Sequence, residues 1–213
     1  MPTEDANLLT DFTDPLAILG RHHLRTRRSL DVLCSVVDSF GQSELTGDDR
    51  RHFEIALRYF RSSVALHTAD EEVSLFPRIL SSSAPRAREA VESIWVLERE
   101  HRMLSRAHDE IERLGLKWIS QRALNDADAD SFRGIVAAVA DTYRKHFAAE
   151  DDVIFRVAGE VLDQPAVAAI GHEMAMRRGI DIESHVSDSA CDTRRSLQAA
   201  VDWHAAAIRR QKS

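Results

Sequence analysis

The stretch FEIALRYFRSSVALHTADEEVS, residues 53–74, indicates the fold class of the chain. Apolar side chains recur along it at intervals of three and four residues, which is the repeat of a helix that buries one face. The same face then continues into polar side chains, so the pattern predicts a bundle helix that carries a histidine and a carboxylate into the core. The positions on this face are Phe53, Leu57, Phe60, Val64, His67, Glu71 and Ser74.

A second stretch, FRGIVAAVADTYRKHFAAEDDV, residues 132–153, repeats this stripe 79 residues later. It again places a histidine and then a glutamate after four apolar or aromatic positions. Because the register is that of a helix seam, we expect both His-x-x-x-Glu pairs to face the core. The positions on this second face are Phe132, Val136, Val139, Tyr143, His146, Glu150 and Val153.

The segments that precede these two stretches repeat each other with an offset of 78 residues. Leu16, Leu19, His23 and Leu30 correspond in order to Ile94, Leu97, His101 and His108. The chain is therefore predicted to consist of two similar helical hairpins, each with one lone histidine and one His-x-x-x-Glu pair. Packed together, the hairpins would form a pseudo-twofold site of four imidazoles and two carboxylates. Its members are His23, His67, Glu71, His101, His146 and Glu150.

The predicted fold class is all-α, an up-down-up-down four-helix bundle with additional C-terminal helices. Few glycines and prolines interrupt long segments rich in residues that favour helix. Pro77 is expected to end the second bundle helix. The helices are expected at about 14–40, 48–76, 86–114, 129–162 and 163–179, with a last amphipathic stretch at 188–210. The expected organisation is an N-terminal extension (1–13), the bundle (14–162) and a C-terminal helical extension (163–213).

The composition limits the classes of partner and the cellular compartment that we expect for this protein. The 213 residues carry a formal net charge of −7, so we do not expect a nucleic acid partner. The acidic first residues hold no apolar segment typical of a secretory signal, and no apolar run approaches the roughly 18 residues that span a membrane. Cys34 and Cys191 have neither metal-site nor redox-motif spacing, so they are expected to be reduced thiols of a cytoplasmic protein.

A single His-x-x-x-Glu match is weak, because about one is expected by chance in a chain of this composition. His108 and Glu112 form a third match, which we interpret as incidental because Glu112 falls off the stripe. The paired register is more specific. Six such groups buried without a metal would each cost about 1–3 kcal/mol, whereas a cation compensates them. A mixed imidazole and carboxylate set fits iron, with manganese or zinc as alternatives.

His23, HTADEE (67–72), EHRML (100–104) and HFAAED (146–151) resemble the hemerythrin-like cation-binding family over about residues 14–160. The resemblance implies a non-haem di-iron centre with an oxo or hydroxo bridge inside a four-helix bundle. It implies that His23 and His67 bind one iron, that His101 and His146 bind the other, and that Glu71 and Glu150 bridge them. His22 is the alternative to His23, but the internal repeat aligns His23 with His101.

The chain departs from the oxygen-carrying members of that family. Those proteins have a second histidine four residues after the first on the third helix, where this chain has Ser105. They also have an aspartate five residues after the fourth-helix histidine; Asp151 stands there, but Glu150 matches the repeat. The resemblance is therefore closer to proteins that repair iron–sulfur centres or act in nitric oxide and peroxide stress. It implies a diatomic molecule or a peroxide as the ligand.

Two functions of different class remain open from the sequence. One is redox handling of O2, NO or peroxide at the metal pair. The other is a binding module without turnover, a metal-dependent sensor or an iron store, which the C-terminal extension suggests. That extension could pack on the bundle or form a homodimer.

Around the site, we expect Glu72, Asp151 and Asp152 to be solvated, Glu100 to orient a ligand, Tyr143 and His108 to be core residues, and His172 and Glu173 not to be ligands. No pocket for a larger organic molecule can be recognised in the sequence.

Overall fold

The computed structural model describes residues 12–40 and 43–181, and every regular element in this part of the chain is helical. The all-α prediction is therefore confirmed. The amphipathic stretch expected at 188–210 lies outside the described residues. The α-helices are α2 (Pro15–Phe40), α3 (Gly47–Ala69), α4 (Phe76–Ser81), α5 (Val91–Gln121), α6 (Asp126–Ala149), α7 (Phe155–Val161) and α8 (Gln164–Arg177). None of these helices is long and apolar enough to cross a membrane.

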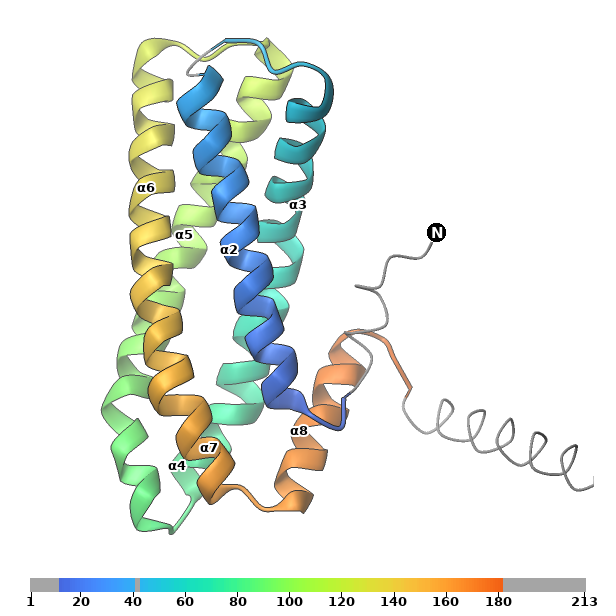
Figure 1. Cartoon of the computed structure of the whole chain (residues 1–213), viewed down its shortest axis with the longest axis vertical. Coiled ribbons are helices and arrows are strands. Elements are labelled where there is room, and N and C mark those ends of the chain that lie inside the picture. The colour runs from blue at the N-terminus through green and yellow to red at the C-terminus, as the bar shows by residue number, and fades with distance from the viewer. Residues whose placement is uncertain (1–11, 41–42, 182–213) are drawn as a thin grey trace, which may run out of the picture. The chain divides into compact units, whose positions relative to one another are not determined.

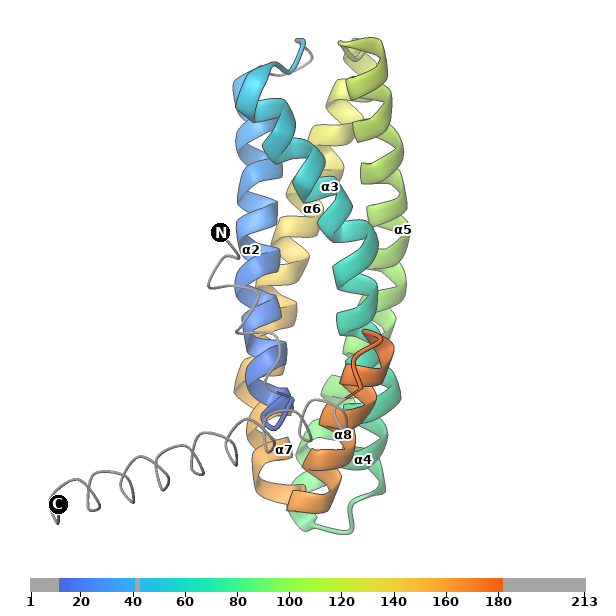
Figure 2. The same ribbon diagram turned by 90° about the vertical axis from the view of Figure 1, so that its right-hand side faces the viewer.

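Four long helices run side by side and alternate in direction, which is the predicted bundle (Figure 1). Helix α2 packs against α3 and α6, and α5 packs against the same two helices. Figure 2 shows the same arrangement from the side, with the start of α3 beside α2 and its other end approaching α5. The two predicted hairpins are thus α2–α3 and α5–α6.

The apolar half of the bundle lies toward the end where α2 joins α3 and α5 joins α6. Phe53, Trp118 and Phe132 pack edge to face there, with ring centroids 5.5–5.9 Å apart. The Trp118 indole N–H donates to the Ser43 carbonyl at 2.7 Å, so the one polar atom of this side chain is satisfied. This apolar cluster fixes the register that carries the polar ends of the stripes toward one another further along the bundle.

Helix α5 ends at Gln121, seven residues later than the predicted Leu114. The residue after the predicted end, Gly115, lies inside the helix where α5 contacts Leu57: a Cβ there would lie 2.6 Å from Leu57 Cδ1. Gly115 therefore allows two helices to approach closely instead of ending one. The chain turns at Arg122, which has a left-handed φ of 65°.

The second predicted helix does not end before Pro77. The segment Asp70–Leu75 is π-helical, and the helix continues beyond it as α4. In this wide turn the Phe76 N–H donates to the Glu71 carbonyl, five residues back, and the proline, which has no N–H, follows directly. The segment Glu150–Ile154 forms a matching wide turn between α6 and α7. In both helices the backbone therefore changes to the wider π-helical form at the glutamate of the stripe.

The first part of α8, up to Met174, packs on the bundle. Gly171 lies against the backbone of Phe12, where a Cβ would lie only 1.9 Å from the Phe12 carbonyl oxygen. The Glu173 carboxylate accepts hydrogen bonds from Ser74 at 2.5 Å and from Arg78 at 2.6 Å. The beginning of the C-terminal extension is thus tied to the π-helical segment that also contains Glu71.

Candidate metal centre

The structure brings all six residues of the predicted site together in the polar half of the bundle. Each is at most 7% exposed. The four histidines come from the four long helices, and the two glutamates come from the two π-helical turns. The residues of this cluster are His23 on α2, His67 on α3, Glu71 on Asp70–Leu75, His101 on α5, His146 on α6 and Glu150 on Glu150–Ile154.

Four of these side chains form the first group. His23, His67, Glu71 and Glu150 each offer one ligand atom, and these atoms all lie within 4.8 Å of one another. His23 Nε2 is 3.0 Å from Glu150 Oε2, and His67 Nε2 is 3.4 Å from Glu71 Oε1. Two imidazole nitrogens and two carboxylate oxygens therefore converge on one point.

The second group consists of His101, His146 and Glu150. The two histidine Nε2 atoms lie 3.0 Å apart, and His146 Nε2 is 2.9 Å from Glu150 Oε1. Glu150 thus presents one oxygen to each group. Glu71 also reaches both groups, because its Oε2 lies 3.4 Å from His101 Nε2. Each glutamate therefore has an oxygen atom near a histidine of both groups.

Three carboxylates hold the outward-facing nitrogens of three of these rings. Glu72 lies 2.9 Å from His101 Nδ1, Asp151 lies 2.9 Å from His23 Nδ1, and Glu100 lies 2.8 Å from His146 Nδ1. Asp151 and Asp152 are exposed, as expected, and Glu72 is partly exposed, but the contacts of Glu72 and Asp151 with histidines of the cluster were not predicted. Glu100 does orient a histidine, although it is His146 and not its neighbour in the sequence.

The sequence did contain a signal for Glu72 and Asp151. They stand 79 residues apart, so the internal repeat extends one residue beyond Glu71 and Glu150. Each acid holds the lone histidine of the other hairpin, so the two hairpins are cross-linked by equivalent contacts.

The tautomers that follow from these contacts favour a cation. Each carboxylate accepts a hydrogen bond from the Nδ1–H group, so the Nε2 atom of the same neutral ring carries a lone pair. His101 and His146 then direct two lone pairs at each other across 3.0 Å, beside a carboxylate oxygen of Glu150. Three acceptors without a donor repel one another, and a metal ion between them would remove the conflict.

Buried atoms without a hydrogen-bond partner point to the same conclusion. Among the described residues they include both nitrogens of His67, His23 Nε2, and all four carboxylate oxygens of Glu71 and Glu150. Leaving buried polar groups unsatisfied costs about 1–3 kcal/mol each, and more when they are charged. Imidazole nitrogen together with carboxylate oxygen is a set that suits iron, manganese or zinc. The geometry therefore fits a metal-binding site.

The electrostatics of the cluster show how protons would occupy it without a cation. Burial raises the pKa of Glu71 well above its usual range, and the neighbouring Glu150 raises it further. Burial would also raise the pKa of Glu150, but contacts with His146 and His23 outweigh it and the net shift is downward. Burial lowers the pKa of His67. Metal-bound carboxylates are deprotonated, so a metal would displace the proton that Glu71 holds, and binding should release it.

His22 and His23 are both buried, but only His23 belongs to a converging group. The His22 ring stacks on His67 with centroids 5.5 Å apart. Glu173 contacts Ser74 and Arg78 instead of the cluster, and His172 is exposed, as expected for residues that are not ligands.

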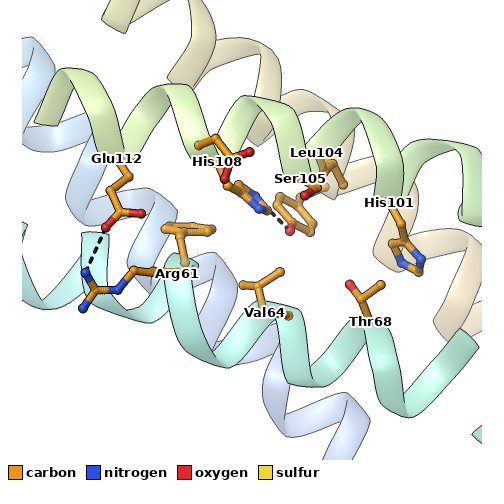
Figure 3. A pocket seen from close by; sticks show the side chains of 12 residues that line it. Arg61, Val64, Thr68, His101, Leu104, Ser105, His108 and Glu112 are labelled. Carbon is orange, nitrogen blue, oxygen red and sulfur yellow. Dashed lines mark hydrogen bonds and ion pairs between the residues drawn. The ribbon is translucent and has the colours of Figure 1, made fainter. Parts of the chain in front are cut away.

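A cleft of about 320 Å³ lies between α3 and α5 and reaches the cluster at His101 (Figure 3). Residues of α3 between Phe60 and Thr68 form one wall, and residues of α5 between His101 and Glu112 form the other. Tyr143 of α6 also lines it and shares a hydrogen bond of 3.1 Å with His108 Nε2. Tyr143 is buried, so the expectation that it is a core residue is confirmed. The cleft itself was not predicted.

Comparisons with known proteins agree with this geometry. The sequence model described as the hemerythrin HHE cation binding domain matches residues 14–158. An uncharacterized protein of Haemophilus influenzae is 23% identical over 172 residues, which cover 79% of this chain and 92% of that protein. The matched domain spans both hairpins and all six residues of the cluster.

Proposed function

The chain belongs to the hemerythrin HHE cation-binding family, and from this premise we propose that it is a non-haem di-iron protein that binds or processes O2, NO or peroxide. The observation that carries the proposal is the pair of converging ligand groups that share Glu150. A single metal would leave one group of buried nitrogen and oxygen atoms without a partner, whereas two metals satisfy both groups.

The proposed ligands divide between the two positions. His23 and His67 would hold one iron, His101 and His146 the other, and Glu71 and Glu150 would bridge them. Bound iron would supply one-electron changes and open coordination positions for a small oxygen or nitrogen ligand. The chain contributes the orientation of the imidazoles, because Glu72, Glu100 and Asp151 fix which ring nitrogen carries the hydrogen.

Ser105 supports a role in stress response or iron-centre repair over oxygen transport. It stands one turn after His101 and lines the α3–α5 cleft. The hydroxyl is too short to replace a ligand imidazole at this position, so the adjacent iron would keep a place for an external molecule that can reach it from the cleft.

To test the proposal, the protein is loaded with iron and reduced in the absence of oxygen. It is then mixed with NO, O2 or hydrogen peroxide in separate experiments. We expect the optical spectrum, and for NO the electron paramagnetic resonance spectrum, to change within the mixing time for at least one of them. The Glu150→Gln variant serves as the negative control because it lacks the shared carboxylate. An iron-loaded protein that responds to none of the three would contradict the proposal.

A metal-dependent sensor is the second candidate, and one contact favours it. Ser74, which directly continues the polar stripe after Glu71, donates to Glu173 of α8. A change at the metal site could thus reach the C-terminal extension through a single π-helical turn. Hydrogen exchange of residues 164–174 tests this: a sensor predicts different protection with and without metal, and Glu173→Gln should abolish the difference. Equal protection in both forms would rule against it.

A further inference from the structure

The α3–α5 cleft has a polar, buried end and a charged, exposed end. His101 lies at the first, and an ion pair between Arg61 and Glu112 of 3.0 Å lies at the second (Figure 3). Along α5 the residues from His101 to Glu112 rise by about 16 Å. The cleft therefore links the surface of the bundle to one ligand of the proposed metal pair.

The volume of the cleft exceeds what a diatomic ligand needs. A water molecule occupies about 30 Å³ in the liquid, and O2 or NO is of similar size. The 320 Å³ of the cleft is at the lower end of the range of about 300–1,000 Å³ seen for pockets that bind small organic molecules. A channel that only had to admit a gas or hydrogen peroxide would not require this space.

The lining favours an uncharged ligand with a polar end and an apolar body. Phe60, Val64 and Leu104 supply buried apolar surface. Burial lowers the pKa of His108 to about 4, so this ring, which shares a hydrogen bond with the Tyr143 hydroxyl, is neutral at neutral pH. The guanidinium of Arg61 is paired with Glu112 at the far end, so the inner end offers no cation for a charged ligand.

The internal repeat shows that the cleft is not a general consequence of bundle packing. The position equivalent to Thr68 in the other hairpin is Phe147, which is fully buried and stacks on His23 with ring centroids 4.1 Å apart. The position equivalent to Ser105 is Arg27, whose guanidinium lies 5.2 Å from the Phe147 ring centroid. Large side chains thus occupy, beside His23, the place that small side chains leave open beside His101.

We propose that the α3–α5 cleft binds the organic part of an alkyl or aryl hydroperoxide, with the peroxide end directed at His101. The choice of a hydroperoxide rests on the proposed function, which includes peroxides among the ligands. The binding of an uncharged, apolar body in the cleft rests on the shape and lining of the cleft alone, and it can be tested without any reaction.

Cumyl alcohol is a suitable probe, because it has the body of cumene hydroperoxide but no peroxide bond to react. The full-length protein, in metal-free and in zinc-loaded form, is titrated with it and followed by calorimetry and by nuclear magnetic resonance. We expect saturable binding with shifts confined to residues 60–68, 101–112 and 143. Absence of binding, or shifts elsewhere on the protein, would overturn the proposal.

Two variants that fill the cleft locate the site. Ser105→Phe should weaken binding at least tenfold, and Thr68→Phe, which introduces the residue of the other hairpin, should do the same. Ser120→Phe is the matched control, because Ser120 is exposed on the same helix and does not line the cleft. Wild-type affinity in both filled variants, with folding confirmed by circular dichroism, would contradict the assignment.

The experiment separates this inference from the proposed function. If cumyl alcohol binds in the cleft but the protein takes up no iron, the cleft is supported and the di-iron function fails. If the protein holds iron and responds to hydrogen peroxide, but cumyl alcohol does not bind, the di-iron function stands and the cleft inference fails.

Discussion

The two lone histidines of the bundle have the same chemical role but different surroundings. His23 is stacked between aromatic side chains, with Phe147 at 4.1 Å and Phe155 at 5.2 Å between ring centroids. His101 stacks only loosely on Phe76, at 6.3 Å, and its other side borders the α3–α5 cleft. Phe76 and Phe155 are equivalent in the repeat, whereas Thr68 and Phe147 are not. The repeated positions define the metal site, and the positions that differ define which side is accessible.

The two histidines of the His-x-x-x-Glu pairs differ as well. His146 Nδ1 contacts the carboxylate of Glu100, while His67 Nδ1 is buried without a hydrogen-bond partner. The residue of the first hairpin that is equivalent to Glu100 is His22, whose ring stacks on His67. A carboxylate behind an imidazole increases its basicity as a ligand. We therefore expect the position held by His146 to bind metal more tightly than the one held by His67.

The largest expected effect is the loss of bound metal when Glu150, the residue that both ligand groups share, is substituted. Glu150→Gln should remove metal from both positions, because one oxygen of Glu150 belongs to each group. Metal content after iron loading and desalting measures this, with Glu89→Gln on the exposed surface as the control. A Glu150→Gln protein that keeps its full metal content would show that the two positions do not depend on a shared carboxylate.

The next effect tests why the His23 side is closed. Phe147→Thr places beside His23 the residue type that Thr68 supplies beside His101, and it removes a fully buried ring from the core. Truncation of a buried phenylalanine costs about 3–5 kcal/mol of unfolding free energy. Urea denaturation measures the loss, and exposed Leu24→Thr should change stability by less than about 0.5 kcal/mol. If Phe147→Thr lost no more stability than Leu24→Thr, the Phe147 ring would not fill the space beside His23.

A smaller effect is expected for the carboxylate behind His146. Glu100→Ala should weaken metal binding about 10–100-fold at one position, because it removes the group that holds the Nδ1 hydrogen. Competition with a chelator measures the affinity, and exposed Glu92→Ala on the same helix is the control. Equal affinities in the two variants would remove the proposed difference between His146 and His67.

The smallest effect concerns pH and the cleft. Burial holds the pKa of His108 at about 4, below the 6.5 of an exposed histidine, so unfolded chains bind more protons in this range and stability falls as the pH falls through it. Between pH 7.5 and 5 the wild type should lose about 2 kcal/mol more unfolding free energy than His108→Leu. Denaturation at several pH values checks this, and parallel pH profiles would contradict a neutral, buried His108.

The sequence predicted the bundle and the six cluster residues because both depend on helix periodicity, which local residues determine. Its errors arose where contacts between helices decide the outcome. Pro77 was expected to end a helix, but the π-helical turn at Glu71 carries the helix past it. The third helix was expected to end near Leu114, but it continues through Gly115, which accommodates Leu57. The cleft depends on the difference in size between Thr68 and Phe147. The consequence of this difference can be recognised only when the two hairpins are compared in three dimensions.

The central claim is that one chain holds a pair of iron ions between its two hairpins. Its most direct test is the iron content of protein purified after iron-supplemented expression, together with the near-ultraviolet absorption before and after reduction. The account predicts two irons per chain and oxo-bridge bands that disappear on reduction. A correctly folded protein with no metal above background would contradict it, and the six cluster residues would then form only a buried polar network.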